Sequence, residues 1–127
     1  MTDHLAVDPA ALDRLGESLG GDLSFLSELV ETYLEDSTGL VAAMDAALEA
    51  GDAERLCRTA HSLKSSSATI GALRLSALSR ELELSARSGQ LTGAAERISL
   101  ITAEFEAVRR GLASFPGVSS EAQAGEP

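Results

Sequence analysis

The fold is decided by residues 52–88, which read DAERLCRTAHSLKSSSATIGALRLSALSRELELSARS. Apolar side chains recur there at three- and four-residue steps, the period of a helix with one buried face. Asp52 can cap a first helix, predicted over 52–70, and Gly71 ends it before a second helix over 72–88. The predicted buried faces consist of Leu56, Ala60, Leu63, Ser67 and Ile70 in the first helix and Leu75, Leu78, Leu82 and Ala86 in the second.

The rest of the chain predicts three further helices. A short helix begins at Asp8, a natural N-cap, and ends near Gly20 and Gly21. A long helix follows over 22–50, and the last one runs over 91–112. Because the connections between these segments are short, consecutive helices are expected to pack antiparallel.

These elements predict an all-α fold, an antiparallel four-helix bundle with a short additional N-terminal helix. No proline occurs between Pro9 and Pro116, so nothing in that interval forbids helix. We expect the bundle to occupy residues 1–113 as one domain. Residues 114–127, SFPGVSSEAQAGEP, are expected to form a disordered tail.

Composition excludes several classes of function. The net charge is −10 and the ten basic residues are scattered, which leaves no basic stripe for a nucleic-acid backbone. The apolar clusters are too short to cross a membrane, no signal peptide is evident, and one cysteine cannot form an internal disulfide. We therefore expect a cytoplasmic protein with a protein partner, and a monomer because one bundle can close its own core.

His61 stands out in the helix over 52–70. At 100° per residue with Leu56 as zero, the core residues fall within about 40° and His61 lies at about 140°. The imidazole is therefore predicted to lie on the outer face. Its neighbours there, three, four or seven residues away, are Cys57, Lys64, Ser65 and Ala68.

Lys64 is the only lysine and lies one turn beyond His61. Its ammonium would favour a neutral, nucleophilic imidazole and would offset the charge of a phosphoryl group on it. A surface histidine and a lysine at this spacing are also ordinary solvated residues. Metal binding is a poorer interpretation, because Cys57 and His61 supply at most two ligands and His4 is remote in sequence.

A longer pattern separates these interpretations. Residues 59–72, TAHSLKSSSATIGA, and the Leu-rich helix after them resemble the histidine-containing phosphotransfer (HPt) family. The family pattern reads Ala-His-x-Leu-Lys-Gly-Ser, a short gap, Gly-Ala, and a helix ending in Leu-Glu. The matching residues are Ala60, His61, Leu63, Lys64, Ser66, Gly71, Ala72, Leu82 and Glu83.

This resemblance implies a phosphocarrier without kinase activity of its own. It implies that His61 takes a phosphoryl group from the aspartyl phosphate of one receiver domain and passes it to another, with Lys64 as the electrostatic helper. The partners would be response-regulator receiver domains and a hybrid sensor histidine kinase. No cofactor would be held by this chain, and the Mg²⁺ would belong to the receiver. The residues expected to contact a partner are Cys57, Ser65, Ala68, Gly71 and Ala72.

The resemblance also implies that Glu83 hydrogen-bonds the imidazole from the next helix. Geometry agrees, because His61 and Glu83 both lie about 15–18 Å from the turn at Gly71. A carboxylate there could hold Nδ1–H and leave Nε2 free to attack. One residue departs from the family: Ser65 replaces the usual glycine, which predicts slower or more selective docking.

Two other functions remain open on the sequence. A histidine-kinase dimerisation domain also carries a phosphohistidine, but it has an acidic residue and a proline near the histidine and requires an ATP-binding domain. This sequence has no proline between Pro9 and Pro116 and shows no such domain, so autophosphorylation from ATP is not expected. A helical adaptor, or an inactive HPt-like bundle that sequesters a receiver, would bind without chemistry. Replacing His61 with glutamine distinguishes the second possibility, because binding would survive and transfer would not.

Overall fold

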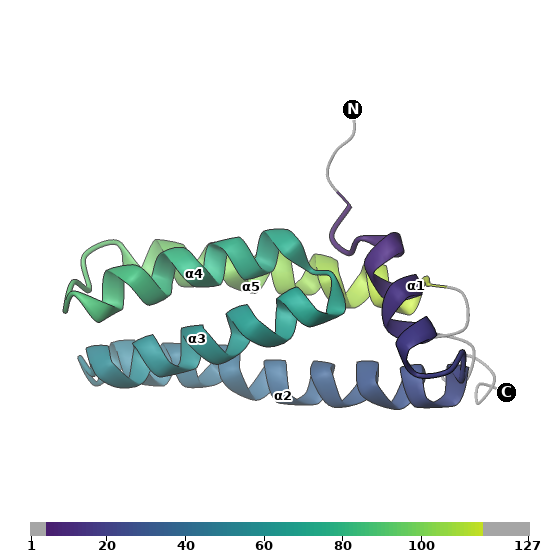
Figure 1. Ribbon diagram of the computed structural model, residues 1–127. Coiled ribbons are helices and arrows are strands. Elements are labelled where there is room, and N and C mark those ends of the chain that lie inside the picture. The colour runs from purple at the N-terminus through teal and green to yellow at the C-terminus, as the bar shows by residue number, and fades with distance from the viewer. Residues whose placement is uncertain (1–4, 116–127) are drawn as a thin grey trace, which may run out of the picture.

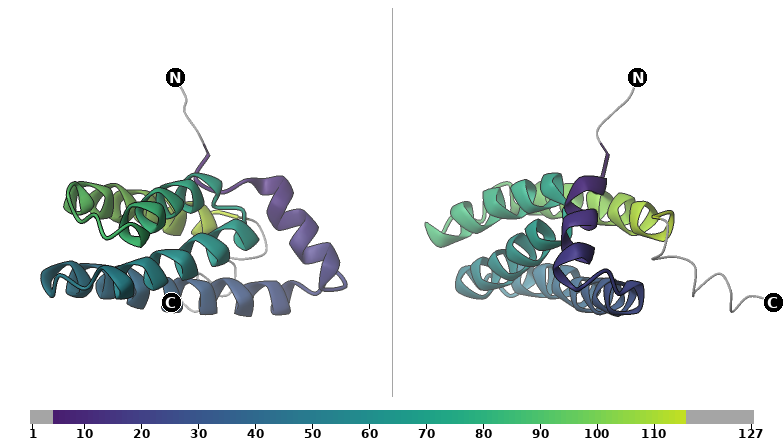
Figure 2. Two further views of the ribbon diagram at one scale, coloured as in Figure 1. Left: turned by 60° about the vertical axis from the view of Figure 1, so that its left-hand side comes forward. Right: turned by 45° about the vertical axis from the view of Figure 1, so that its right-hand side comes forward.

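The computed structural model describes residues 5–115, and within this range it contains five α-helices and no strand. The helices are α1 (Pro9–Ser18), α2 (Leu23–Glu49), α3 (Ala53–Ile70), α4 (Leu73–Arg87) and α5 (Ala94–Ala113). α2 to α5 lie side by side, and α1 crosses one end of them (Figure 1 and Figure 2). This arrangement confirms the predicted four-helix bundle with a short N-terminal helix.

Aspartate caps fix the starts of the first three helices. The Asp8 carboxylate accepts a hydrogen bond from the backbone N–H of Ala10, and Asp22 accepts from Ser24 and Phe25. Asp52 accepts from the N–H of Arg55. Each bond satisfies an N–H that has no partner inside its own helix, so these helices begin where the sequence predicts.

Contacts between successive helices close the bundle into a ring. The most extensive contact joins α3 to α4, and further contacts join α2 to α3, α4 to α5, and α5 back to α2. The whole predicted core face of α3 is buried, from Leu56 to Ile70. Full burial of a leucine such as Leu63 or Leu82 stabilises the fold by about 1.5–3 kcal/mol.

Two boundaries differ from the sequence prediction. α5 begins at Ala94 and not at Leu91, because Gly93 adopts a left-handed conformation with φ of 79° and ends the preceding turn. Ser114 caps α5, and Phe115 packs partly buried against the core. The folded part therefore includes two residues that were assigned to the tail. The rest of the predicted tail lies outside the described residues.

Gly71, the residue that turns the chain from α3 into α4, is covered by α1. It adopts a left-handed conformation with φ of 88°, and its carbonyl accepts a hydrogen bond from the N–H of Asp8 at 2.9 Å. A Cβ at this position would lie 2.8 Å from the Cβ of Ala11. Glycine is therefore required here both by the backbone conformation and by the close approach of α1.

Candidate functional site

His61 lies in the middle of α3 with its ring at the surface. Its side chain is 58% exposed, and its Nδ1 atom lies 2.7 Å from Oε2 of Glu83 on α4. This contact engages Nδ1, so Nε2 is the ring nitrogen available for a reaction. Both the outward position of His61 and the contact with Glu83 agree with the sequence predictions.

Glu83 is a buried carboxylate shared by three side chains. Its side chain is only 2% exposed. Oε1 lies 2.8 Å from Nζ of Lys64, whereas Oε2 lies 2.8 Å from a guanidinium nitrogen of Arg87 and also contacts His61. The carboxylate thus has a cation on each oxygen, which compensates for its removal from water.

These partners keep Glu83 ionised despite its burial. The hydrogen bond from Lys64 is the main cause that lowers the pKa of Glu83 below its ordinary value. Burial acts in the opposite direction, and the hydrogen bond and charge of His61 add to the lowering. An ionised carboxylate only accepts hydrogen bonds, so the Nδ1 atom of a neutral His61 must carry the hydrogen.

The antiparallel α3–α4 hairpin brings these residues to one level. His61 lies ten residues before Gly71 and Glu83 twelve after it, so the two helices carry them to similar distances from the turn. The Ser76 hydroxyl donates to the backbone carbonyl of Lys64 at 2.9 Å, which ties α4 to α3 between the turn and the site. The register that pairs His61 with Glu83 is therefore held by the hairpin itself.

The predicted neighbours of His61 divide into two groups. Ser65 and Ala68 are exposed and Cys57 is partly buried, so these three flank the imidazole on the surface of α3. Gly71 and Ala72 are both buried, which corrects the prediction that they contact a partner. Their place in the motif reflects the turn and the packing of α1 over it.

The structure adds to the predicted site at Lys64 and at Arg87. Lys64, predicted as the electrostatic helper one turn beyond His61, pairs its ammonium with the carboxylate that contacts the imidazole, and its side chain is 28% exposed. Arg87 was not predicted at all. Its spacing of four residues from Glu83 was the available signal, because side chains at i and i+4 share one face of a helix.

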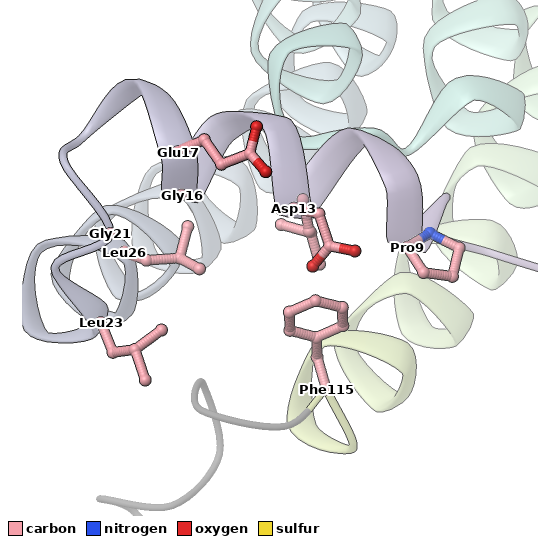
Figure 3. Close-up of a pocket in the computed structure, with 9 residues that line it drawn as sticks. Pro9, Asp13, Gly16, Glu17, Gly21, Leu23, Leu26 and Phe115 are labelled. Carbon is pink, nitrogen blue, oxygen red and sulfur yellow. The ribbon is translucent and has the colours of Figure 1, made fainter.

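A cleft at the α1 end of the bundle contains none of the predicted site residues. α1 contributes Asp13 and Glu17 to its lining, and Leu23 and Leu26 line it from α2. Figure 3 shows the Phe115 ring facing α1 from the other side of this cleft. Its two carboxylates would repel a phosphoryl group, so the cleft is not an alternative site for phosphotransfer.

Within residues 5–115, no group of three or more histidine, cysteine, aspartate or glutamate side chains is placed to hold a metal ion. None of the helices in this range combines the length and the apolar character needed to cross a membrane.

Comparisons with known proteins agree with this geometry. The family model of the Hpt domain matches residues 28–111, which include His61 and Glu83. The crystal structure of histidine-containing phosphotransfer protein B from Pseudomonas aeruginosa superposes with a TM-score of 0.81 at 34% sequence identity. The match covers 96% of this chain and 98% of that one. A comparison with the curated proteins finds no match.

Proposed function

The chain belongs to the Hpt domain family, and from this premise we propose that His61 is the residue that carries the phosphoryl group. Membership makes the protein a histidine phosphotransfer component of a phosphorelay, a phosphocarrier whose partners are receiver domains and kinases. The proposal rests on one observation: a buried carboxylate holds Nδ1 of an exposed histidine at 2.7 Å.

In the proposed reaction, the lone pair of His61 Nε2 attacks the phosphorus of a receiver's aspartyl phosphate. The new P–N bond forms as the P–O bond to the aspartate breaks, and that electron pair returns to the aspartate carboxylate. The ring keeps its Nδ1 hydrogen and becomes positively charged, and the Glu83 carboxylate stabilises this charge through the existing hydrogen bond. Transfer to a second receiver reverses these steps.

The energy for this reaction comes from the aspartyl phosphate, so the chain needs no ATP. The Mg²⁺ that aspartyl phosphate chemistry requires is assigned to the receiver. The protein supplies a rigid histidine and charge balance around it. Catalysis of this kind depends mainly on positioning and electrostatics, because phosphoryl transfer requires little covalent chemistry from the protein.

The proposed docking surface is the part of α3 around the imidazole. Cys57, Ser65 and Ala68 have short side chains, so a receiver can bring its aspartate close to Nε2. Ser65 places a hydroxymethyl group where the family has glycine, which is expected to slow docking or make it more selective. We further propose that a hybrid sensor histidine kinase acts upstream of this protein, that the protein is cytoplasmic, and that it is a monomer.

The test is transfer from a phosphorylated receiver domain to the wild-type protein and to a His61→Gln variant. We expect acid-labile, base-stable label on the wild type and none on the variant. A His4→Gln variant is the matched control, because it removes the only other histidine and should be labelled normally. If the wild type binds receivers but is never labelled, the protein is a sequestering bundle and the proposal is wrong.

A further inference from the structure

Arg87 contacts the site, but the family motif in this sequence does not include it. It lies one helical turn after Glu83 on α4, and a guanidinium nitrogen is 2.8 Å from Oε2. The same oxygen lies 2.7 Å from Nδ1 of His61. Arg87 therefore shares an acceptor atom with the imidazole, so a substitution of Arg87 can alter the hydrogen bond between Glu83 and the His61 ring.

The two cations approach Glu83 from opposite directions along the hairpin. Lys64 lies one turn closer to Gly71 than His61 does, whereas Arg87 lies one turn farther from Gly71 than Glu83 does. They also differ in exposure, since the Lys64 side chain is 28% exposed and the Arg87 side chain 61%. Lys64 is thus the internal partner of the carboxylate, and Arg87 is the partner at the surface where the ring lies.

The charges of this group suit a phosphorylated ring. With a neutral imidazole, the carboxylate and its two cations leave one positive charge in excess, in a chain whose net charge is −10. A phosphoryl group adds up to two negative charges. Arg58, three residues before His61 on α3, lies 3.9 Å from Glu54 in an exposed ion pair, so it lacks the buried partner that holds Arg87 at the site.

We propose that Arg87 is a positioning residue for phosphotransfer: by neutralising Oε2 of Glu83 at the surface, it stabilises phosphorylated His61 relative to the receiver's aspartyl phosphate. This inference rests on the proposed function of His61. Loss of Arg87 leaves the carboxylate with one cation, and the negative phosphoryl group then lies beside a site without excess positive charge. The free energy of the phosphohistidine rises, and the equilibrium moves toward the receiver.

The experiment measures the equilibrium between receiver and histidine phosphate for the wild type, Arg87→Ala and Arg87→Lys. We expect Arg87→Ala to lower the fraction on His61 with an equilibrium constant reduced about threefold, the size typical of a partly screened charge. Arg87→Lys should restore most of this loss, because it keeps the charge. Arg110→Ala is the matched control, since it removes an exposed arginine from α5 and should leave the equilibrium unchanged.

Salt separates a charge effect from a structural one. The difference between wild type and Arg87→Ala should shrink from 50 mM to 500 mM salt, because exposed charges are screened. The inference is overturned if Arg87→Ala behaves like Arg110→Ala, or if the alanine and lysine variants are equally impaired at both salt concentrations. In both cases the wild type still carries label on His61. If the wild type carries no label, the proposed function fails, and this inference fails with it.

Discussion

Two buried polar groups lie against opposite flanks of α3, and burial has different consequences for them. Counted over the whole residue, Glu83 on α4 is 1% exposed and Tyr33 on α2 is 6% exposed. Burial raises the pKa of Tyr33 above its ordinary value, and its hydrogen bonds to serine side chains oppose this only in part. The pKa of Glu83 is lowered, because the hydrogen bond from Lys64 outweighs burial.

The difference shows that the partners of a buried group decide its charge. The Tyr33 hydroxyl lies 2.9 Å from the Ser67 hydroxyl, and its ring packs edge-on against Phe105 at 6.5 Å. These partners are neutral, so the tyrosine keeps its proton and contributes to core packing through its ring and its hydrogen bond. Glu83 has cations on both oxygens and remains ionised beside an exposed histidine. The two groups should therefore respond differently to substitution.

The largest expected difference between the two groups is in the rate of transfer. Glu83→Ala should reduce the rate of phosphoryl transfer to His61 about 10- to 100-fold, because the imidazole loses the group that holds its tautomer and orientation. Tyr33→Phe should leave the rate within about twofold, the scatter of a substitution that does not contact the ring. Rapid-quench measurement of label on the protein gives both rates.

The conservative Glu83→Gln variant controls for loss of packing. It keeps the shape of the side chain and an oxygen that can accept from Nδ1, but it lacks the charge, so its rate should fall between those of wild type and alanine. Circular dichroism at the assay temperature checks that all variants are folded. Equal rates for wild type and Glu83→Ala would show that the contact does not orient the nucleophile.

A smaller difference is expected in the dependence of stability on pH. The folded-state pKa of Glu83 lies below the ordinary value of 4.5, so its contribution to the free energy of unfolding is present above this pH. The contribution is lost as pH falls from about 5 through the folded-state pKa. Urea unfolding between pH 3 and 7 should give a steeper acid loss for wild type than for Glu83→Gln. Parallel curves for the two proteins would contradict a lowered folded-state pKa of Glu83.

Tyr33 should show the opposite dependence, on the alkaline side. Its folded-state pKa lies above 10.0, so its contribution is complete below pH 10 and is lost as pH rises further. Tyr33→Phe should remove this alkaline dependence, which urea unfolding between pH 8 and 11 would detect. An alkaline loss of the same size in wild type and variant would assign it to other groups.

The smallest effect is the cost of the Tyr33 hydroxyl at neutral pH. Tyr33→Phe should lower the free energy of unfolding by about 1 kcal/mol, the net contribution of one hydrogen bond. Thermal unfolding followed by circular dichroism would show this as a decrease of about 4–8 °C for a small domain. An unchanged midpoint would mean that Ser67 finds another partner without cost.

Helix positions were predictable because their signals are local. Asp8 and Asp52 cap the helices that they were expected to cap, and Asp22 caps the helix that was predicted to begin there. Each cap involves only the next two or three residues. The start of α5 was missed by three residues, because Leu91 continues the apolar pattern of the helix although it belongs to the preceding turn. Apolar spacing does not reveal where a left-handed glycine begins a helix.

Arg87 shows why a correct spacing was not enough to find a site residue. Glu83 and Arg87 are four residues apart on α4, and Glu54 and Arg58 have the same spacing on α3. The first pair closes at 2.8 Å on a buried carboxylate, whereas the second stays at 3.9 Å with both side chains exposed. The spacing is common to both, and burial alone distinguishes them.

By itself, the sequence determined the helical bundle and the outward position of His61, because both follow from the spacing of side chains along single helices. The resemblance of the sequence to the HPt family pointed to Glu83, and the distance of each residue from the turn at Gly71 agreed with it. Only the tertiary structure decided that this carboxylate is buried, that Lys64 and Arg87 share it, and that α1 covers Gly71. These features depend on how closely α4 and α1 pack against α3, which no local pattern encodes.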